Sequence, residues 1–412
     1  MKILFLSNFL PYPPDTGTKM RSLNFLKYLA KKGEVTLIAP GDPAIDVKHA
    51  SEIKNYCAKV VLIDSKTYGP NSTIGKKFNF SERMKQLIKM EPWSLQDFVS
   101  EGFKQKLLNL KPETFDLIFI RYVQPAYYFL TDSRLKPLLK KIVIDVDDIS
   151  INMQERRIKG MNFGYGKVRH SLDLIFLKNY YKKIKDTRAC FITNLKDKEF
   201  LLKQGFSKNV FVIPNTIEVN GARRNSAVVD NAEILFCGTL SFPHNEEAAL
   251  YFCNDVFPKV KSEIPSAHLS IVGKNPTEKV LKLNSIPGVS VVGSVPSMEP
   301  YYEKAAVVVV PLLNGAGTRI KILEAMSYQK PVIATSIGAE GLDVTDGENI
   351  YIADDPCLFA SRCVELLKDA CKGISIGVKG YELVKAQYDT SIFDQKMDEV
   401  FNSFQRGSRV NR

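Results

Sequence analysis

Short apolar runs alternate with stretches of helical periodicity along most of the chain. Residues 2–8 form an apolar run that ends in small polar residues, which is typical of a strand buried in a parallel sheet. Residues 17–32 repeat apolar side chains at helical spacing and end at Gly33, and another apolar run follows at 34–40. The first forty residues therefore predict a strand, a helix and a second strand.

The same alternation predicts the remaining elements. Further apolar runs predict strands at 59–64, 115–121, 141–145, 187–193, 233–238, 267–273, 289–292, 306–311 and 332–335. Apolar spacing predicts helices at 81–111, 168–185, 245–261, 296–305, 318–328, 355–370 and 374–405, the last broken near Tyr388. Polar or glycine-containing stretches predict a loop at 66–80 and a mobile basic loop at 155–170.

A polar stretch at 216–230 divides the chain into two regions that both alternate strands with helices. Because 412 residues suit two domains, we expect two doubly wound α/β domains, 1–215 and 216–385, with a final helix at 386–412 packing on the first. Ligands of such sheets bind beyond the carboxyl ends of the strands. Two such domains facing across a cleft would form a natural site for a donor and an acceptor.

The charge and cysteine content narrow the class of protein. The chain has a net charge of +12 and an isoelectric point near 9.1. It is therefore either a basic cytosolic enzyme without a special partner or a protein that binds a partner rich in negative charge. Phosphates or an anionic membrane surface are favoured as that partner over nucleic acid, because no nucleic-acid-binding motif is found. Seven scattered cysteines without a Cys-x-x-Cys pair favour a reducing compartment and argue against zinc or a disulfide framework.

The distribution of apolar residues predicts a cytoplasmic protein. The N-terminus has no pattern of a signal peptide, because its apolar run breaks at once into a proline-rich stretch at 11–14. The longest apolar stretch, 305–313, is shorter than the roughly 20 residues of a membrane-spanning helix. Any membrane contact is therefore expected to be peripheral, at the inner face of the cell membrane.

One glycine loop carries the strongest chemical signal. A buried strand runs through Asn314 and Gly315 into Gly317 and Thr318, and a helix with basic residues in its first turn follows. Glycines let a ligand approach the backbone, and free amides at a helix start bind phosphate. Arg319 and Lys321 would add charge there, and an anion would relieve their conflict with the helix dipole. The alternative is a plain turn with exposed basic side chains.

The residues around this loop resemble a known family. Residues 315–326 read Gly-Ala-Gly-Thr-Arg-Ile-Lys-Ile-Leu-Glu-Ala-Met, 330–335 read Lys-Pro-Val-Ile-Ala-Thr, and 338–342 read Gly-Ala-Glu-Gly-Leu. These segments are similar to the donor-site signature of the family 4 glycosyltransferases, in the branch with Gly-Thr-Arg-x-Lys. The resemblance implies the GT-B fold, with an N-terminal acceptor-binding domain and a C-terminal domain that binds a nucleotide sugar. It also implies transfer of a sugar from a nucleoside diphosphate to a hydroxyl, with retention of configuration at the anomeric carbon. The resemblance is weaker over residues 65–210.

The resemblance assigns donor-site residues by position. Glu324 matches the second glutamate of the Glu-x7-Glu motif, which implies binding of the ribose hydroxyls; the first glutamate is replaced by Ala316. The Arg and Lys pair usual in the first loop of the second domain is absent, so Arg319 and Lys321 are expected to neutralise the diphosphate as the catalytic residues. The remaining donor-binding positions are expected to be Gly17, Gly238, Thr239, Asn314, Gly315, Gly317 and Thr318.

A second group of residues is expected to contact the donor sugar or the acceptor. Its members lie at predicted strand ends or helix starts, and they are Asp15, Arg21, Arg121, Tyr122, Asp145 and His244. For Asp15, Arg121, Tyr122 and Asp145 an ordinary role as a helix cap or strand-end residue is the alternative. The carboxylates Asp145, Asp147 and Asp148 also suggest a general base or a metal site, but family members hold the diphosphate with amides and basic residues, so no metal and no cofactor are expected.

Two other functions stay open on the sequence. One is a nucleotide-sugar epimerase on the same fold, and the other is a non-catalytic sugar- or lipid-binding relative. A dinucleotide dehydrogenase is disfavoured because no Gly-x-Gly-x-x-Gly follows the first strand. The basic residues from Arg156 to Arg169 suggest a lipid-linked glycan acceptor at a membrane surface, in the biosynthesis of a polysaccharide or glycoconjugate; a solvated loop explains the same charge.

Overall fold

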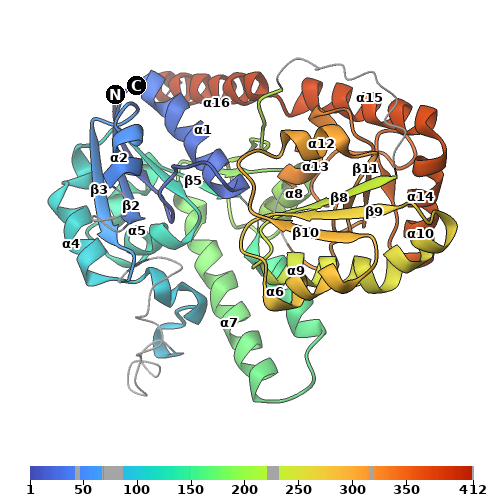
Figure 1. The fold of residues 1–412 in the computed structure, drawn as a ribbon. Helices are drawn as coiled ribbons and strands as arrows, with labels where there is room; N and C mark the ends of the chain where they lie inside the picture. The colour runs from blue at the N-terminus through green and yellow to red at the C-terminus, as the bar shows by residue number, and fades with distance from the viewer. Residues whose placement is uncertain are drawn as a thin grey trace. The chain divides into compact units, whose positions relative to one another are not determined.

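The computed structural model describes residues 1–41, 47–66, 68, 87–147, 149–219, 232–315 and 319–410. The chain divides into two compact units. Unit 1 comprises Met1–Pro214 together with Met397–Arg412, and unit 2 comprises Asn215–Lys396. Each unit is built around its own parallel sheet (Figure 1).

Unit 1 contains a seven-stranded sheet in the order β3-β2-β1-β4-β5-β6-β7. Every neighbouring pair is parallel. The strands are β1 (Lys2–Leu6), β2 (Glu34–Gly41), β3 (Lys59–Asp64), β4 (Leu117–Arg121), β5 (Ile142–Asp147), β6 (Ala189–Ile192) and β7 (Val210–Val212). The order reverses between β1 and β4, which makes the carboxyl ends of these two strands the switch point where ligands bind in such sheets.

Helices cover the sheet of unit 1. They are α1 (Gly17–Lys32), α2 (Val47–Ile53), α4 (Glu101–Asn109), α5 (Tyr127–Thr131), α6 (Ser150–Lys159), α7 (Tyr165–Lys182), α8 (Leu195–Lys203) and α16 (Thr390–Val410). Short 3-10 turns are η2 (Trp93–Phe98), η3 (Pro112–Thr114), η4 (Gln124–Ala126), η5 (Lys136–Lys141) and η6 (Lys183–Asp186). The carboxylate of Asp398 in α16 accepts hydrogen bonds from Tyr28 and Lys32 of α1, at 2.6 and 2.7 Å.

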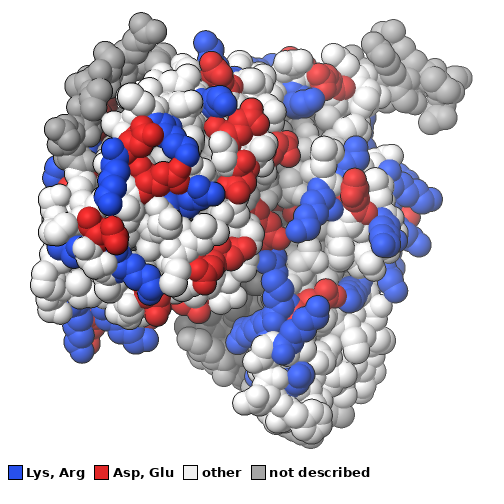
Figure 2. Space-filling model, turned by 90° about the vertical axis from the view of Figure 1, so that its right-hand side faces the viewer, with Lys and Arg blue, Asp and Glu red and all other residues white. Residues whose placement is uncertain are grey.

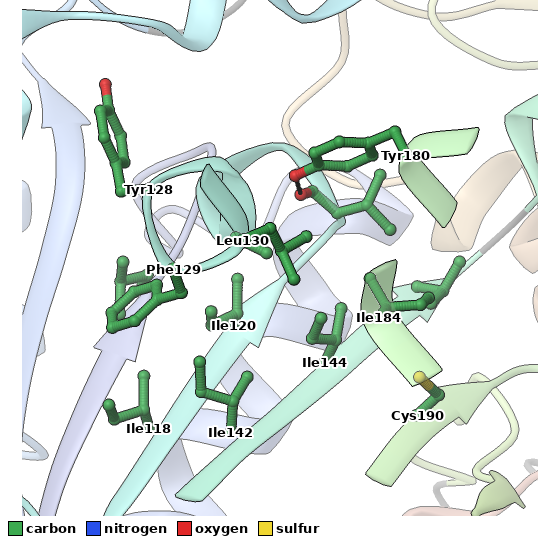
Figure 3. Packing of buried hydrophobic residues seen from close by; sticks show 14 of the residues in the cluster. Ile118, Ile120, Tyr128, Phe129, Leu130, Ile142, Ile144, Tyr180, Ile184 and Cys190 are labelled. Carbon is green, nitrogen blue, oxygen red and sulfur yellow. Dashed lines mark hydrogen bonds between the residues drawn. The ribbon is translucent and has the colours of Figure 1, made fainter. Parts of the chain in front are cut away.

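The central strands are apolar on both faces because both faces are covered. All five residues of β4 and all six of β5 are buried. Figure 3 shows one side of this core, where isoleucines of β4 and β5 face Phe129 and Leu130 of α5 and Tyr180 of α7. The Tyr180 hydroxyl donates to the carbonyl of Val123 at 2.7 Å, so the one polar atom of that ring is satisfied within the core.

Unit 2 contains a six-stranded parallel sheet in the order β10-β9-β8-β11-β12-β13. Its strands are β8 (Glu233–Cys237), β9 (His268–Val272), β10 (Val289–Gly293), β11 (Val307–Val310), β12 (Val332–Ala334) and β13 (Tyr351–Ile352). Its helices are α9 (Pro243–Tyr251), the π-turn η7 (Phe252–Val256), α10 (Phe257–Glu263), α11 (Glu278–Leu281), η8 (Lys282–Ser285), α12 (Glu299–Lys304), α13 (Ile320–Ser327), α14 (Pro356–Lys368) and α15 (Ala370–Gln387). Two doubly wound parallel sheets with a C-terminal helix that contacts the first unit confirm the predicted fold class.

Several predicted elements are wrong in detail. The loop predicted at 155–170 is largely helical, because α6 continues to Lys159 and α7 begins at Tyr165. The glycines that suggested a loop mark helix ends instead, with Gly160 after α6 and Gly164 before α7. The described part of the helix predicted at 81–111 is interrupted by η2, and the two-residue strand β13 was not predicted. Most of the predicted loop at 66–80 and of the linker at 216–230 lies outside the described residues.

Candidate functional site

The donor-site candidates of unit 2 gather at the carboxyl ends of β8 and β11 and at the start of α13. Gly238 and Thr239 directly follow β8, and Gly315 lies in the loop between β11 and α13. Arg319 occupies the position just before α13, and Lys321 lies in its first turn. Gly317 and Thr318, predicted to contact the diphosphate, lie outside the described residues.

Close packing explains why glycine stands at two positions of this site. A Cβ at Gly273 would lie 1.6 Å from the carbonyl oxygen of Gly238, so no side chain fits there. A Cβ at Gly238, whose φ is +154°, would lie 2.8 Å from the Nζ atom of Lys321. The loop after β8 is therefore pressed against both β9 and the lysine of α13.

Lys321 is held by neutral groups. Its Nζ atom donates to Oδ1 of Asn245 at 2.9 Å and lies 5.4 Å from the ring centroid of Phe236. Nδ2 of Asn245 donates to the carbonyl of Thr239 at 2.9 Å, which fixes the amide orientation. Burial lowers the pKa of Lys321 to about 8, and the nearby charge of Arg319 contributes to that lowering. The ammonium would therefore gain from a neighbouring anion.

Arg319 lies over the glycine loop. The residue is 7% exposed, and Nη2 donates to the carbonyl of Ile337 at 3.4 Å. Gly315 adopts a φ of +130°, and a Cβ there would lie 3.0 Å from Nη2 of Arg319. The absence of a side chain at Gly315 thus leaves room for the guanidinium.

His244 is kept neutral by its surroundings. Burial, together with the charges of Lys321 and Arg319, lowers the pKa of the imidazole to about 4. His244 is the second residue of α9, and its ring centroid lies 5.7 Å from that of Phe242, the residue before the helix. At neutral pH His244 therefore offers one donor and one acceptor without adding charge.

Glu324 lies one turn further along α13 and is oriented by a tyrosine. The buried Tyr302 hydroxyl donates to Oε2 of Glu324 at 3.1 Å, and the Tyr302 ring stacks on Tyr328 with centroids 5.0 Å apart. Burial raises the pKa of Glu324, while Tyr302 and Lys321 oppose that rise. The carboxylate is thus held in one orientation, as a ligand for neighbouring hydroxyls requires.

The other predicted donor residues take more ordinary partners. The exposed Asn314 donates through Nδ2 to Oε2 of Glu247 at 3.0 Å. Thr239 is half-buried, and its backbone carbonyl accepts from Asn245. Gly17 is the first residue of α1 in unit 1, so its predicted contact with the diphosphate stays a prediction.

Unit 1 carries a second charged cluster at the carboxyl edge of its sheet. Arg21 of α1 donates to Asp145 through Nε and Nη2 at 2.9 and 2.6 Å, and to the carbonyl of Ile213 at 2.8 Å. Arg121, at the end of β4, donates to Asp145 and, at 3.1 Å, to Asp147. These charged groups are buried and bind each other, so the three predicted residues Arg21, Arg121 and Asp145 do come together. Their predicted contacts with a sugar or an acceptor stay predictions.

Two residues of this cluster adopt backbone angles that are uncommon outside glycine. Tyr122 has a φ of +67° and Asp147 a φ of +64°. The Tyr122 hydroxyl lies 3.0 Å from Oδ2 of Asp147 and 3.2 Å from Oγ1 of Thr18. Burial opposes ionisation of Asp147, but Arg121 and Arg21 outweigh it and lower the pKa of the carboxyl. Strained residues that are held in this way are frequent at functional sites.

Asp15 lies apart from that cluster. Its carboxylate pairs with Lys19 at 2.9 Å on the surface, and the cap of α1 is Thr16, whose side chain accepts from the Lys19 amide. Asp148, the third carboxylate of the predicted acidic group, lies outside the described residues. Over the part of the chain that the structure describes, no group of three His, Cys, Asp or Glu side chains is placed to hold a metal ion. Over the same part, no helix is both long enough and apolar enough to cross a bilayer.

Sequence analysis missed two residues of the unit 2 site. Asn245 belongs to the loop that resembles the family, and an amide three residues into a helix facing a glycine loop could have been noticed. Tyr302 gave no such signal, because its partner Glu324 lies on another helix 22 residues away. Only the folded sheet brings α12 and α13 together.

Solved structures share this fold over nearly the whole chain. Sucrose-phosphate synthase from Thermosynechococcus elongatus has a TM-score of 0.69 at 17% identity, covering 99% of this chain and 100% of that one. Anabaena HepE in complex with UDP-glucose has a TM-score of 0.64 at 13% identity, covering 98% and 100%. A mutant of Staphylococcus aureus TarM in complex with fondaparinux, α-GlcNAc-glycerol and UDP has a TM-score of 0.65 at 11% identity, covering 98% and 100%.

The sequence is also similar to one family and one curated relative. Residues 231–369, which span most of unit 2 and its whole charged site, match the family described as Glycosyl transferases group 1. An uncharacterized 44.6 kDa protein in the cps region of Klebsiella pneumoniae is 25% identical over 401 residues, which cover 94% of this chain and 97% of that protein. The family match is confined to residues 231–369, whereas the structural matches extend over nearly the whole chain. The chain therefore has the fold of these solved structures, and its donor-site region resembles the group 1 glycosyl transferases.

Proposed function

We propose that the chain transfers a sugar from a uridine diphosphate donor to a hydroxyl of a saccharide or lipid-linked acceptor, with retention at the anomeric carbon, during synthesis of a cell-surface polysaccharide or glycoconjugate. The nucleotide is suggested by HepE, which was solved with UDP-glucose, and by TarM, which was solved with UDP. The pathway is suggested by the cps-region relative from Klebsiella pneumoniae.

The observation that carries the proposal is the pair of cations at the start of α13. Arg319 and Lys321 lie close enough for the arginine to lower the pKa of the lysine, and their cationic groups reach the glycine loops at Gly315 and Gly238. A diphosphate would relieve this repulsion and accept hydrogen bonds from both side chains. Fixed cations of this kind stabilise the charge that develops on a leaving diphosphate.

The remaining donor contacts follow from the same geometry. In the proposal Glu324 accepts from the ribose hydroxyls, and the loops at Gly238–Thr239 and Asn314–Gly315 lie against the phosphates. Neutral His244 would hydrogen-bond the donor sugar or a phosphate oxygen. In the proposal the acceptor attacks from the face of the leaving group, with the departing phosphate assisting deprotonation of the acceptor hydroxyl.

The acceptor is assigned to unit 1. The carboxyl edge of its sheet carries Thr18, Tyr122 and Asp147, whose polar groups lie together beside the switch point of β1 and β4. This edge is where a doubly wound sheet binds its ligand.

A panel of nucleotide sugars tests the proposal. The purified chain is titrated by calorimetry with UDP-glucose, UDP-galactose, UDP-N-acetylglucosamine, GDP-mannose and ADP-glucose, and products are analysed with and without saccharide acceptors. We expect one UDP-sugar to bind at micromolar Kd and to give a new glycoside only when an acceptor is present. Formation of an epimeric nucleotide sugar without acceptor would instead support an epimerase, and binding of no nucleotide sugar would overturn the proposal.

A further inference from the structure

The helices α6 and α7 form a hairpin that extends unit 1 beyond the carboxyl edge of its sheet. α6 begins at Ser150, just after β5 ends at Asp147, and its ten residues run for about 15 Å. α7 then returns along it, and all the buried residues of α7 lie from Asp173 onward. The connecting turn at 160–164 is at the bottom of Figure 1.

The end of this hairpin exposes large apolar side chains. Phe163 in the turn is 92% exposed and Tyr165, the first residue of α7, is 80% exposed. Val168 and Ile175 are exposed by 47% and 49%, and their spacing of seven residues places them on one face of α7. Single exposed apolar residues are ordinary, but two neighbouring aromatic rings at the tip of a protruding element point to an interaction surface.

Basic residues surround these rings. Residues 150–170 contain five Lys and Arg side chains and one acidic side chain, Glu155. Among them Arg156, Arg157, Lys159 and Arg169 are exposed. In Figure 2 the lowest lobe of the surface ends in uncharged atoms, with Lys and Arg side chains gathered above them. The tip of the hairpin therefore exposes apolar side chains to solvent, with basic side chains next to them.

The hairpin is fixed to the body of unit 1 by polar contacts at its base. The buried carboxylate of Asp173 accepts from the amides of Trp93 and Ser94 at 2.6 and 3.3 Å, and from the side chain of Gln154 at 3.3 Å. Lys178 of α7 pairs with Glu155 of α6 at 2.6 Å. The tip is thus held in place before any partner binds, so binding loses little conformational entropy.

We propose that the tip of the α6–α7 hairpin docks on an anionic lipid bilayer, with Phe163 and Tyr165 entering the headgroup region and Arg157 and Lys159 lying against the lipid phosphates. Aromatic rings beside Lys and Arg are the side chains that favour a membrane–water interface. A narrow convex tip suits a deformable lipid surface better than a protein partner, which would need about 1,000 Å² of matched area. The inference deepens the proposed function, because it places the acceptor edge of unit 1 beside lipid-linked acceptors.

Vesicle binding tests this inference without requiring turnover. The full chain is sedimented with sucrose-loaded vesicles of phosphatidylcholine containing either no phosphatidylglycerol or 40% phosphatidylglycerol, at 0.05 and 0.3 M salt. We expect binding to the anionic vesicles alone, weakening at higher salt because the charges are screened. The double substitution Phe163→Ser and Tyr165→Ser is expected to lower the partition coefficient roughly tenfold to a hundredfold. Arg157→Gln with Lys159→Gln is expected to lower it by about fivefold per charge.

Matched controls distinguish binding through the tip from nonspecific binding through any exposed apolar or basic side chain. Leu195→Ser removes a side chain that is 61% exposed elsewhere in unit 1, and Lys282→Gln with Lys379→Gln removes two exposed lysines of unit 2. Both controls should bind vesicles like the wild type. Equal binding by the tip variant and the wild type would overturn the proposal, as would concentration-dependent dimerisation that the tip variant abolishes while vesicles bind neither protein. Loss of vesicle binding with intact UDP-sugar binding separates this inference from the proposed function.

Discussion

The two charged clusters of this protein are built from similar residues but differ in the balance of their charges. In unit 1, Arg21 and Arg121 face two carboxylates, Asp145 and Asp147, and the four charges cancel within a buried network. In unit 2, Lys321 donates to the neutral Asn245 and, within the described residues, forms no ion pair. The neighbouring Arg319 repels it, and the only carboxylate close by in α13, Glu324, has a pKa raised by burial.

This difference suggests that the cluster of unit 1 stabilises the folded state, whereas the cluster of unit 2 is arranged to bind an anionic ligand. A buried cation that is matched by a carboxylate has little to gain from a phosphate, whereas a buried lysine that bonds a neutral amide and is repelled by a neighbouring arginine gains a great deal. The first cluster should therefore appear in measurements of stability, and the second in measurements of donor binding and turnover.

Asp145→Asn should have the largest effect and should act on stability. The substitution leaves two buried guanidinium groups with one carboxylate, and breaking a buried pair in this way costs about 3–5 kcal/mol. Urea unfolding followed by circular dichroism should show that loss in the free energy of unfolding of unit 1.

Asp15→Asn is the matched control for that measurement. Its pair with Lys19 has side chains that are 29% and 25% exposed, so we expect a change of about 0–1 kcal/mol. If Asp145→Asn were as stable as the wild type yet lost acceptor turnover, Asp145 would belong to the acceptor site, and the contrast between the clusters would fail.

Arg319→Ala should have the next largest effect and should act on catalysis. Removing one group that stabilises transition-state charge typically lowers the rate by about 10²–10³-fold. We expect that loss in kcat with the free energy of unfolding little changed, because the Nη2 atom of Arg319 donates a long bond, 3.4 Å, to the carbonyl of Ile337. Arg134→Ala, which removes an exposed arginine of unit 1, should turn over like the wild type; a near-normal rate for Arg319→Ala would exclude it from the diphosphate site.

The pH dependence of donor binding should report Lys321. Its pKa near 8 in the free enzyme means that the ammonium is largely charged at pH 7 and loses its proton as the pH rises through 8. The diphosphate requires the charged form, so the Kd for the UDP-sugar should rise by up to tenfold per pH unit above 8. Calorimetry between pH 6.5 and 9.5 should show this rise in the wild type and a flatter profile in Lys321→Arg. An inflection near pH 6.5 is not expected, because the pKa of His244 is about 4.

The fold was largely predictable because its determinants are local. A strand that is buried on both faces must be apolar throughout, so strands such as residues 307–310 can be predicted from the sequence. The exceptions have the same physical basis. β13 is two residues long and too short to leave a pattern, and the glycines near 160–164 look alike whether they end helices or lie in a loop.

The site was predictable only in part. Residues close in sequence, such as Arg319, Lys321 and Glu324, lie on one helix start, and their proximity follows from helical geometry. The ion pair of Arg21 could not be predicted from the sequence, because its carboxylate partner, Asp145, lies 124 residues away. Nothing in the local sequence distinguishes an arginine that forms an ion pair from one that does not. Sequence patterns indicate which residues reach an edge of the sheet, but the pairing of their charges is decided by packing.

Tyr302→Phe should have the smallest effect and tests whether the tyrosine positions Glu324. Losing the hydroxyl removes one hydrogen bond to the carboxylate, worth about 1 kcal/mol, so we expect KM for the donor to rise about fivefold with kcat little changed. The hydroxyl also opposes the raised pKa of Glu324, so its loss should raise that pKa further and move the acidic limb of kcat/KM to higher pH. Tyr351→Phe removes an equivalent bond, 3.2 Å to Glu365, and should leave that limb in place. An acidic limb that does not move in Tyr302→Phe would mean that Glu324 is not the carboxylate that binds the donor, since a purely structural role for Tyr302 changes stability without shifting the pH profile.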